Sequence, residues 1–278
     1  MKKILVPTDF SEFSANALNF AVHIAKKTNS LLEIVNIHFR DDPAIKDETR
    51  PKLKEFLANA TQACDVELVD IEERKAVSGE ISCKLTIRQG FIVDEIISYS
   101  NQESVDLIVM GTRGAGVMKK YILGTNSADV IKKANCPVLT IPGRARFNQM
   151  NKIIFPVELK ENVGKKVLYT KKLFNQIGGE VRLLHIKNED SAKTDEKVKA
   201  LRNNLSEVGL ENCDIHVVDM IENVSKSIEK YSADHKPDLL VLAPSHHNLF
   251  ERLFGKSVTL RLAFHLNIPM LSLSGKFD

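Results

Sequence analysis

The sequence predicts an α/β fold that occurs twice in tandem, and three observations support this prediction. Short apolar runs that suit buried strands alternate with stretches whose apolar residues recur every three or four positions, as they do in helices. A strand, a helix and a strand follow one another within residues 1–38, which requires a right-handed crossover between parallel strands. The same order of motifs starts again after residue 150. We therefore expect two domains, residues 1–146 and 147–278, each with a parallel sheet of about five strands and helices on both faces.

The first half contains five expected strands that are separated by helical patterns. The strands are expected at residues 3–6, 31–38, 82–88, 107–110 and 138–141, and the helices at residues 13–25, 51–64, 91–99 and 128–135. Ser11 or Ser14 is expected to cap the first helix, because both are small polar residues at its start. A polar stretch from Arg40 to Thr49 is expected to interrupt the pattern before the second helix.

A glycine-rich stretch joins the strand at residues 107–110 to the last helix of this half. Gly111, Gly114 and Gly116 allow positive φ angles and let backbone N–H groups approach a ligand closely. Gly124-Thr125-Asn126-Ser127 then leads into the helix, whose first N–H groups suit an anion. A strand, a glycine loop and a helix start in this order predict a phosphate site at the carboxyl edge of a parallel sheet.

The second half repeats the landmarks of the first. Lys3–Asp9 matches Lys152–Glu158 at a shift of 149 positions. After one shortening the shift is 132 positions, both between Val105–Met110 and Pro237–Leu242 and between Asn135–Leu139 and Asn267–Leu271. A shift that is constant at both ends of a repeat, with one shortening between them, indicates a duplicated domain. The basic, irregular stretch at residues 143–149 is the expected junction.

Composition excludes several classes of protein. The net charge of +3 is small and no dense Lys/Arg run with interleaved aromatics occurs, so we expect no nucleic-acid partner. The four cysteines form no CxxC pair and have no histidine at metal spacing, which favours free thiols in a reducing compartment over disulfides. No segment reaches about 18 consecutive apolar residues, so no membrane span is expected. The expected location is the cytoplasm.

Three motifs of the first half together resemble those of a known family. The pattern Gly111-x2-Gly114-x9-Gly124-Thr125, with Pro7-Thr8-Asp9-x-Ser11 before it and Asn135-Cys136-Pro137-Val138-Leu139 after it, resembles the ATP-binding class of the universal stress protein family. The resemblance covers essentially the whole chain, as a tandem member with two domains. It implies Rossmann-like (adenine nucleotide alpha hydrolase-like) domains, bound ATP with Mg²⁺ as an option, and a regulatory or stress-response role.

The resemblance also implies roles for single residues. Asp9 would contact the nucleoside, and Pro7 and Thr8 would shape the pocket beside the adenine. Ile37 would read the adenine edge through its backbone, and Met110 and Gly111 would line the base and the ribose. The phosphates would be surrounded by Arg113, Gly114, Gly124, Thr125, Asn126 and Ser127. Simpler interpretations stay open: Asp9 as a helix cap, Arg113 as a solvated cation, and the glycine loop as a connection without a ligand.

The second domain departs from the pattern. Ala243, Ser245 and His246 stand where the first domain has Gly111, Arg113 and Gly114, and Val157-Glu158 replaces Thr8-Asp9. The stretch Gly255–Thr259 keeps the last glycine and the small polar residues. We therefore expect the second domain not to bind ATP as the first does. His246-His247 is interpreted as a surface pair, because adjacent residues point apart and no acidic or Cys partner is near.

The motif favours binding over catalysis. No Ser/His/Asp or Cys/His arrangement can be assigned, so we name no catalytic and no metal-ligating residue and expect at most slow ATP hydrolysis. Two alternatives stay open, a nucleotide-dependent enzyme on the same fold and a ligand-free interaction scaffold. The resemblance implies an intrachain pseudo-dimer that pairs the last strands, Val138–Ile141 and Met270–Leu273, and it leaves a further homodimer open. The sequence identifies no protein partner.

Overall fold

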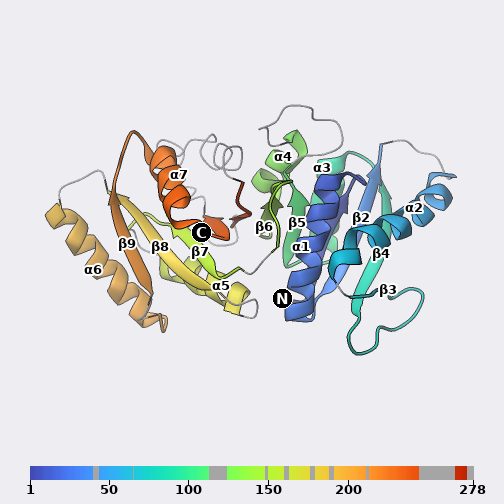
Figure 1. The fold of residues 1–278 in the computed structure, drawn as a ribbon, viewed down its shortest axis with the longest axis horizontal. Coiled ribbons are helices and arrows are strands. Elements are labelled where there is room, and N and C mark those ends of the chain that lie inside the picture. Colours follow the sequence, from blue (N-terminus) through green and yellow to red (C-terminus); the bar gives the residue numbers. More distant parts are fainter. Residues whose placement is uncertain are drawn as a thin grey trace. The chain divides into compact units, whose positions relative to one another are not determined.

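The protein consists of two compact α/β units, Met1–Phe147 (unit 1) and Asn148–Asp278 (unit 2). The computed structural model describes residues 1–39, 44–64, 66–112, 124–147, 150–159, 163–175, 179–187, 191–210, 213–243 and 267–273. Figure 1 shows the helices and strands of each unit. The prediction of two tandem α/β domains with parallel sheets is confirmed.

The described residues of unit 1 form six strands, four α-helices and one 3-10 helix. In chain order they are β1 (Lys3–Thr8), α1 (Glu12–Thr28), β2 (Leu31–His38), α2 (Ala44–Thr61), η1 (Gln62–Cys64), β3 (Leu68–Asp70), β4 (Ile81–Gln89), α3 (Ile92–Gln102), β5 (Leu107–Gly111), α4 (Thr125–Lys133) and β6 (Val138–Ile141). The strands of this unit lie in the order β3-β4-β2-β1-β5-β6 and are all parallel.

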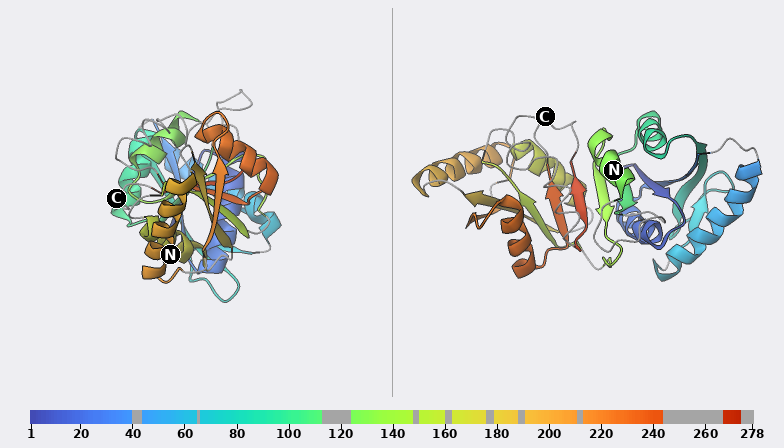
Figure 2. Two further views of the ribbon diagram at one scale, coloured as in Figure 1. Left: turned by 90° about the vertical axis from the view of Figure 1, so that its left-hand side faces the viewer. Right: turned by 90° about the horizontal axis from the view of Figure 1, so that it is seen from above.

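The chain changes direction across the sheet of unit 1 at β1. It proceeds from β1 to β2 and beyond, and then returns to place β5 on the other side of β1. The helices that follow β1 and β5 therefore leave toward opposite faces: α1 packs with α2, and α4 packs with α3. Figure 2 shows one such helix pair on each side of the sheet. A point of this kind is where open α/β sheets bind ligands, outside the carboxyl ends of the strands.

Helix α1 begins and ends where its sequence predicts. Ser11 is the N-cap residue, and its Oγ accepts a hydrogen bond of 3.2 Å from the Ser14 N–H. Asn29 ends the helix in the left-handed conformation, which Asn adopts more readily than most residues. The apolar face between them is buried, with Phe20 among the largest buried side chains of the unit. Of the two expected caps, Ser11 is the one that the structure uses.

Unit 2 repeats this architecture with fewer described elements. They are β7 (Lys152–Pro156), α5 (Val163–Asn175), β8 (Glu180–Lys187), α6 (Ser191–Glu207), β9 (Asp214–Asp219), α7 (Val224–His235), β10 (Leu239–Leu242) and β11 (Met270–Ser272). The strands of this unit lie in the order β11-β10-β7-β8-β9 and are parallel. Its central strand β7 is therefore the counterpart of β1.

In each unit an equivalent aspartate accepts hydrogen bonds from the backbone at the start of the central strand. In unit 1, Asp106 Oδ2 accepts hydrogen bonds from the backbone N–H groups of Lys2 at 2.6 Å and Lys3 at 3.0 Å. In unit 2, Asp238 Oδ2 accepts from the N–H groups of Asn151 at 3.0 Å and Lys152 at 2.9 Å. The repeat that the sequence indicates is thus reproduced at the level of single hydrogen bonds.

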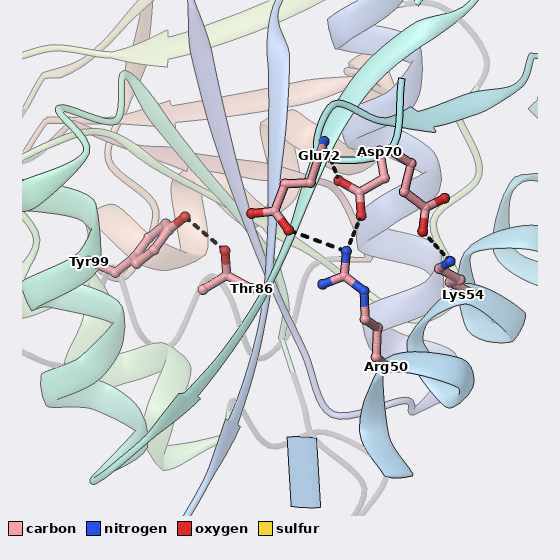
Figure 3. Close-up of polar contacts among 7 residues, drawn as sticks. Arg50, Lys54, Asp70, Glu72, Thr86 and Tyr99 are labelled. Atoms are coloured by element: carbon pink, nitrogen blue, oxygen red, sulfur yellow. Dashed lines mark hydrogen bonds and ion pairs between the residues drawn. The ribbon is translucent and has the colours of Figure 1, made fainter. Parts of the chain in front are cut away.

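A repeated tyrosine has different hydrogen-bond partners in the two units. Tyr99 of α3 donates a hydrogen bond of 2.6 Å to Glu33 Oε2, and Glu33 is 1% exposed. Figure 3 shows the second contact of this hydroxyl, 3.2 Å from Thr86 Oγ1. In unit 2 the hydroxyl of the equivalent Tyr231 of α7 lies 2.7 Å from His216 Nδ1, and Arg182, at the position of Glu33, pairs with Asp214 at 2.6 Å.

Two features of unit 1 differ from the prediction. Strand β3 was not expected, because a three-residue strand is too short to show a periodic pattern. Helix α2 begins at Ala44, so part of the stretch expected to interrupt the pattern is helical and Pro51 lies inside the helix. Tertiary contacts hold these polar turns: Thr49 Oγ1 lies 3.0 Å from His38 Nε2, and Arg50 pairs with Asp70 of β3 at 2.7 Å.

The cysteines behave as the sequence predicts. Cys64, Cys83, Cys136 and Cys213 are all free and buried. Within the described parts of the chain, no helix is both long and apolar enough to cross a membrane.

Candidate functional site

The carboxyl ends of β1, β2 and β5 lie side by side in unit 1, and most of the predicted site residues lie at these ends. The register pairs Thr8 at the end of β1 with Asn36 of β2, one residue before Ile37. On the other side of β1, strand β5 ends at Gly111. The structure therefore brings together segments that lie far apart in the sequence.

Apolar residues from these strands share one face of the sheet. Side chains alternate along a strand, and Glu33 of β2 contacts Tyr99 on the α3/α4 face. Ile37 lies four residues after Glu33 and therefore projects toward the same face. Lys3 Nζ lies 3.6 Å from Glu33 Oε1, so Lys3 of β1 also projects toward this face. Pro7 lies four residues after Lys3, and alternation along β1 places it on the same face. Met110, buried in β5, also lies on this face, because its neighbour Gly111 lies against α1 on the other.

Thr8 projects toward the opposite face. Its Oγ1 lies 3.1 Å from the Ser14 Oγ of α1 and accepts a hydrogen bond of 3.1 Å from the Phe10 N–H. Phe10 has a positive φ of 63°, so the chain turns sharply after β1. Thr8 therefore holds the turn between β1 and α1, and its side chain lies away from the apolar residues of the α3/α4 face.

Asp9 lies in this turn and is exposed. Its Oδ1 accepts hydrogen bonds from the Ser11 N–H at 3.1 Å and from the Ser11 Oγ at 2.6 Å. The alternative role considered for Asp9, the helix cap, belongs to Ser11 instead. Asp9 positions the capping residue, and its carboxylate lies directly after the central strand at the carboxyl edge.

Gly111 packs closely against helix α1. A Cβ at this position would lie 2.9 Å from the backbone oxygen of Phe13 in α1, so a larger residue does not fit without a backbone shift. The Gly111 carbonyl accepts a hydrogen bond of 2.9 Å from the Ser127 Oγ of α4. Gly111 thus links the end of β5 to helices on both faces of the sheet.

The N-terminus of α4 lies at the same edge. Gly124 is its N-cap residue, has no side-chain cap, and donates its N–H to the Thr112 carbonyl at 2.7 Å. Thr125 and Asn126 in the first turn are exposed, whereas Ser127 is buried. The first N–H groups of an α-helix have no partner within the helix and carry the positive end of its dipole. This edge therefore presents donors suited to an anion.

Two predicted phosphate contacts lie outside the described residues, namely Arg113 and Gly114. Their roles stay predictions, as does the assignment of every other site residue to a ligand. In unit 2, Ala243 and Glu158 are described, while Ser245, His246 and the stretch Gly255–Thr259 lie outside the described ranges. Ala243 follows β10 directly at the position that Gly111 occupies in unit 1.

The prediction missed Asn36, a buried polar residue beside the site. Its Nδ2 donates a hydrogen bond of 2.8 Å to the Thr8 carbonyl, which ties β2 to the turn after β1. Among the described residues, its buried Oδ1 has no hydrogen-bond partner. The signal was present in the sequence, because an asparagine inside the apolar run LLEIVNIH needs a buried partner. Ser14 was considered only as a cap and instead braces Thr8.

A cavity of about 690 Å³ lies elsewhere in unit 1, between the end of α2 and strands β3 and β4. Apolar side chains such as Leu57 and Leu85 line it together with charged groups such as Lys54 and Glu73. Figure 3 shows that Arg50 pairs with Asp70. Lys54 pairs with Glu73. None of the predicted site residues lines this cavity, so the candidate site rests on the strand order and contacts at the carboxyl edge.

Comparisons with known proteins agree with this architecture. The sequence profile described as the universal stress protein family matches residues 1–142. A universal stress protein of Methanocaldococcus jannaschii is 32% identical over 163 residues, which cover 50% of this chain and 94% of the relative. A second relative, from a Synechocystis species, is 23% identical over 300 residues, or 98% of this chain and 99% of its own.

A solved structure shows the same fold over the whole chain. A universal stress protein from Archaeoglobus fulgidus has a TM-score of 0.68 at 20% sequence identity, over 99% of this chain and 97% of its own. At this identity the likeness shows the fold alone. The fold defines a tandem protein of two Rossmann-like α/β units, and the profile match is more specific. The chain belongs to the universal stress protein family.

Proposed function

We propose that unit 1 binds ATP and that the protein is a nucleotide-binding universal stress protein with a regulatory or stress-response role. The observation that carries this proposal is the convergence of Asp9 and the N-terminus of α4 at the strand-order reversal beside β1. A carboxylate there can accept from ribose hydroxyls or help to hold Mg²⁺, and the helix N-terminus suits the phosphates.

The apolar residues of the α3/α4 face support the orientation of the nucleotide. With the phosphates at α4, next to β5, a nucleotide that extends along the carboxyl edge reaches Pro7 and Ile37 with its base. Met110 adds a buried apolar surface between them and α4. Burial of a planar base against aliphatic side chains is favourable, because it removes apolar surface from water.

We propose further that the site retains ATP and does not turn it over. Phosphoryl transfer requires a group that positions or deprotonates the nucleophile. Among the described residues at this edge, Asp9 is the carboxylate that follows the central strand, and its Oδ1 already holds Ser11. A cytoplasmic location and an intrachain pseudo-dimer through the last strands are parts of the same proposal, the former supported by the four buried free thiols.

Mass spectrometry and calorimetry on the purified full-length protein test this proposal. We expect adenine nucleotide among the small molecules released on denaturation, and about one ATP bound per chain. Asp9→Asn is expected to weaken ATP binding about tenfold, which corresponds to about 1.4 kcal/mol. Asp195→Asn is the matched control, because it makes the same change at an exposed position of α6 in unit 2.

Two outcomes would overturn parts of the proposal. Absence of released nucleotide together with no binding at millimolar ATP would reject ATP as the ligand and favour the ligand-free scaffold. Multiple turnovers with Mg²⁺ that disappear in Asp9→Ala would reject retention and favour an enzyme.

A further inference from the structure

Two phenylalanines are exposed together at the carboxyl edge of unit 1. Phe39 is 71% exposed and Phe91 is 67% exposed. Their ring centroids lie 5.4 Å apart at an interplanar angle of 67°, an edge-to-face contact. The next residue of α3, Ile92, is 43% exposed and extends this apolar surface. Single exposed apolar residues are common, but a pair of rings that contact each other in solvent is a candidate binding surface.

The pair lies next to the proposed nucleotide site. Phe39 follows the last residue of β2, and Phe91 is the N-cap residue of α3, two residues after the end of β4. A hydrogen bond of 2.9 Å from the Gly90 N–H to the His38 carbonyl joins the two strand ends. Because β2 is the neighbour of β1, Phe39 lies one strand away from Asp9, and Phe91, after β4, lies two strands away; neighbouring strands are about 4.8 Å apart.

The pair lies beyond the expected position of the base. Along the carboxyl edge the order is β4, β2, β1 and β5, with α4 following β5. A nucleotide with its phosphates at α4 and its base over Ile37 therefore directs the outer side of the base toward β2 and β4. Phe39 comes two residues after Ile37, and its ring contacts Phe91 at the start of α3, so the pair lies at the α3/α4 face of the sheet.

The charges beside this surface are balanced. Arg88 is the register partner of Ile37, and its Nε lies 2.8 Å from Glu95 Oε2. The same guanidinium lies over the Tyr99 ring, 5.7 Å from the ring centroid. Because the cation and the carboxylate are paired with each other, the surface favours an uncharged group.

We propose that Phe39 and Phe91 form an aromatic subsite that binds an uncharged planar or apolar group carried on the outer edge of the base. The preferred ligand is then an adenine nucleotide extended at its base, and ATP fills only part of the site. The inference rests on the proposed nucleotide site of unit 1. A third ring can pack against the two phenylalanines with the offset or edge-to-face geometry that aromatic groups prefer.

Calorimetry on the full chain with two probes tests the inference: ATP, and ATP that carries a benzyl group on its exocyclic amine. We expect the benzyl analogue to bind about tenfold more tightly, which corresponds to about 1.4 kcal/mol. Phe39→Ala and Phe91→Ala are each expected to reduce this preference to less than about threefold, or about 0.6 kcal/mol. Val77→Ala, which truncates an apolar side chain that is 65% exposed and follows β3, is expected to keep the preference.

The outcomes separate this inference from the proposed function. Equal or weaker binding of the benzyl analogue, with ATP bound, rejects the aromatic subsite alone. A tenfold preference that survives in both alanine variants also rejects it. Binding of the benzyl analogue without binding of ATP supports the subsite and rejects ATP as the ligand. Failure of both probes rejects both proposals.

Discussion

Gly111 and Gly143 both lie against Phe13, Gly111 against its backbone and Gly143 against its ring. A Cβ on Gly111 would lie 2.9 Å from the Phe13 backbone oxygen, whereas a Cβ on Gly143 would overlap the ring carbon Cε1. Backbone cannot move aside without shifting α1, but a ring can be shortened by substitution. The two glycines therefore have different reasons to lack a side chain.

This difference can be measured with double-mutant cycles in urea unfolding. We expect Gly111→Ala and Gly143→Ala each to lower the free energy of unfolding by about 1–3 kcal/mol, the usual cost of overpacking. Combination with Phe13→Leu should recover most of the loss at Gly143 and little of it at Gly111. Equal recovery at both positions would contradict the backbone contact.

The buried thiol of Cys83 predicts a pH dependence. Burial, together with the nearby Asp70 and Glu73 carboxylates, raises the pKa of this thiol from 9.0 to about 12. Because the pKa is higher in the folded state, the stabilising contribution is complete below pH 9 and is lost as the pH rises toward 12. We expect the free energy of unfolding to fall less steeply over this range in Cys83→Ala. Identical slopes in both proteins would contradict a raised pKa.

At the scale of elements, the start of α1 links stability to binding. Ser11 caps α1 and also donates to Asp9, so Ser11→Ala removes the cap and a hydrogen bond that orients the proposed ribose or Mg²⁺ ligand. We expect Ser11→Ala to cost about 1 kcal/mol of stability and to weaken ATP binding as well.

A cap in unit 2 provides the control for this variant. Asn223 caps α7 by accepting a hydrogen bond of 3.0 Å from the Lys226 N–H. Asn223→Ala should cost a similar stability, measured by urea unfolding, and should leave ATP affinity unchanged in calorimetry. Weaker ATP binding in both variants would show that the effect at Ser11 is one of general stability.

The sequence predicts elements where local pattern and packing agree. The strand at β1 and the cap at Ser11 follow from apolar runs and small polar residues at fixed positions. The early start of α2 could not be predicted, because contacts to His38 and Asp70 hold turns that are polar and contain Pro51. Local propensity is overridden there by tertiary contacts.

The candidate site was predictable in part for the same physical reasons. Motif positions identify Asp9 and the start of α4, and the strand order brings them to one edge. Which face a side chain occupies depends on the register, so the orientation of Thr8 toward Ser14 required the structure. The double role of Gly111 also required it, because the contact with α1 joins distant parts of the chain.

For the whole molecule, the proposals predict that a ligand stabilises one unit only. A ligand that binds the folded state at about 100 times its dissociation constant adds about 2.7 kcal/mol of stability. With ATP we expect slower hydrogen exchange in peptides of β1, β5 and α4 and unchanged exchange in β7 and β10. Mass spectrometry of the exchanged peptides checks this expectation, and equal protection in both units would contradict a single site.

The tyrosines of the two units suggest how the interior of a duplicated domain can diverge. A phenol hydroxyl both donates and accepts hydrogen bonds. Tyr99 therefore donates to the carboxylate of the buried Glu33, whereas the Tyr231 hydroxyl lies 2.7 Å from His216 Nδ1, at equivalent positions of the repeat. Arg182, at the position of Glu33, pairs with Asp214 instead, so the strand residue beneath such a tyrosine can reverse its charge where a neighbouring side chain takes over as the partner of the hydroxyl. Two copies of a repeated domain can in this way differ in the polar contacts around a shared tyrosine without a change of fold.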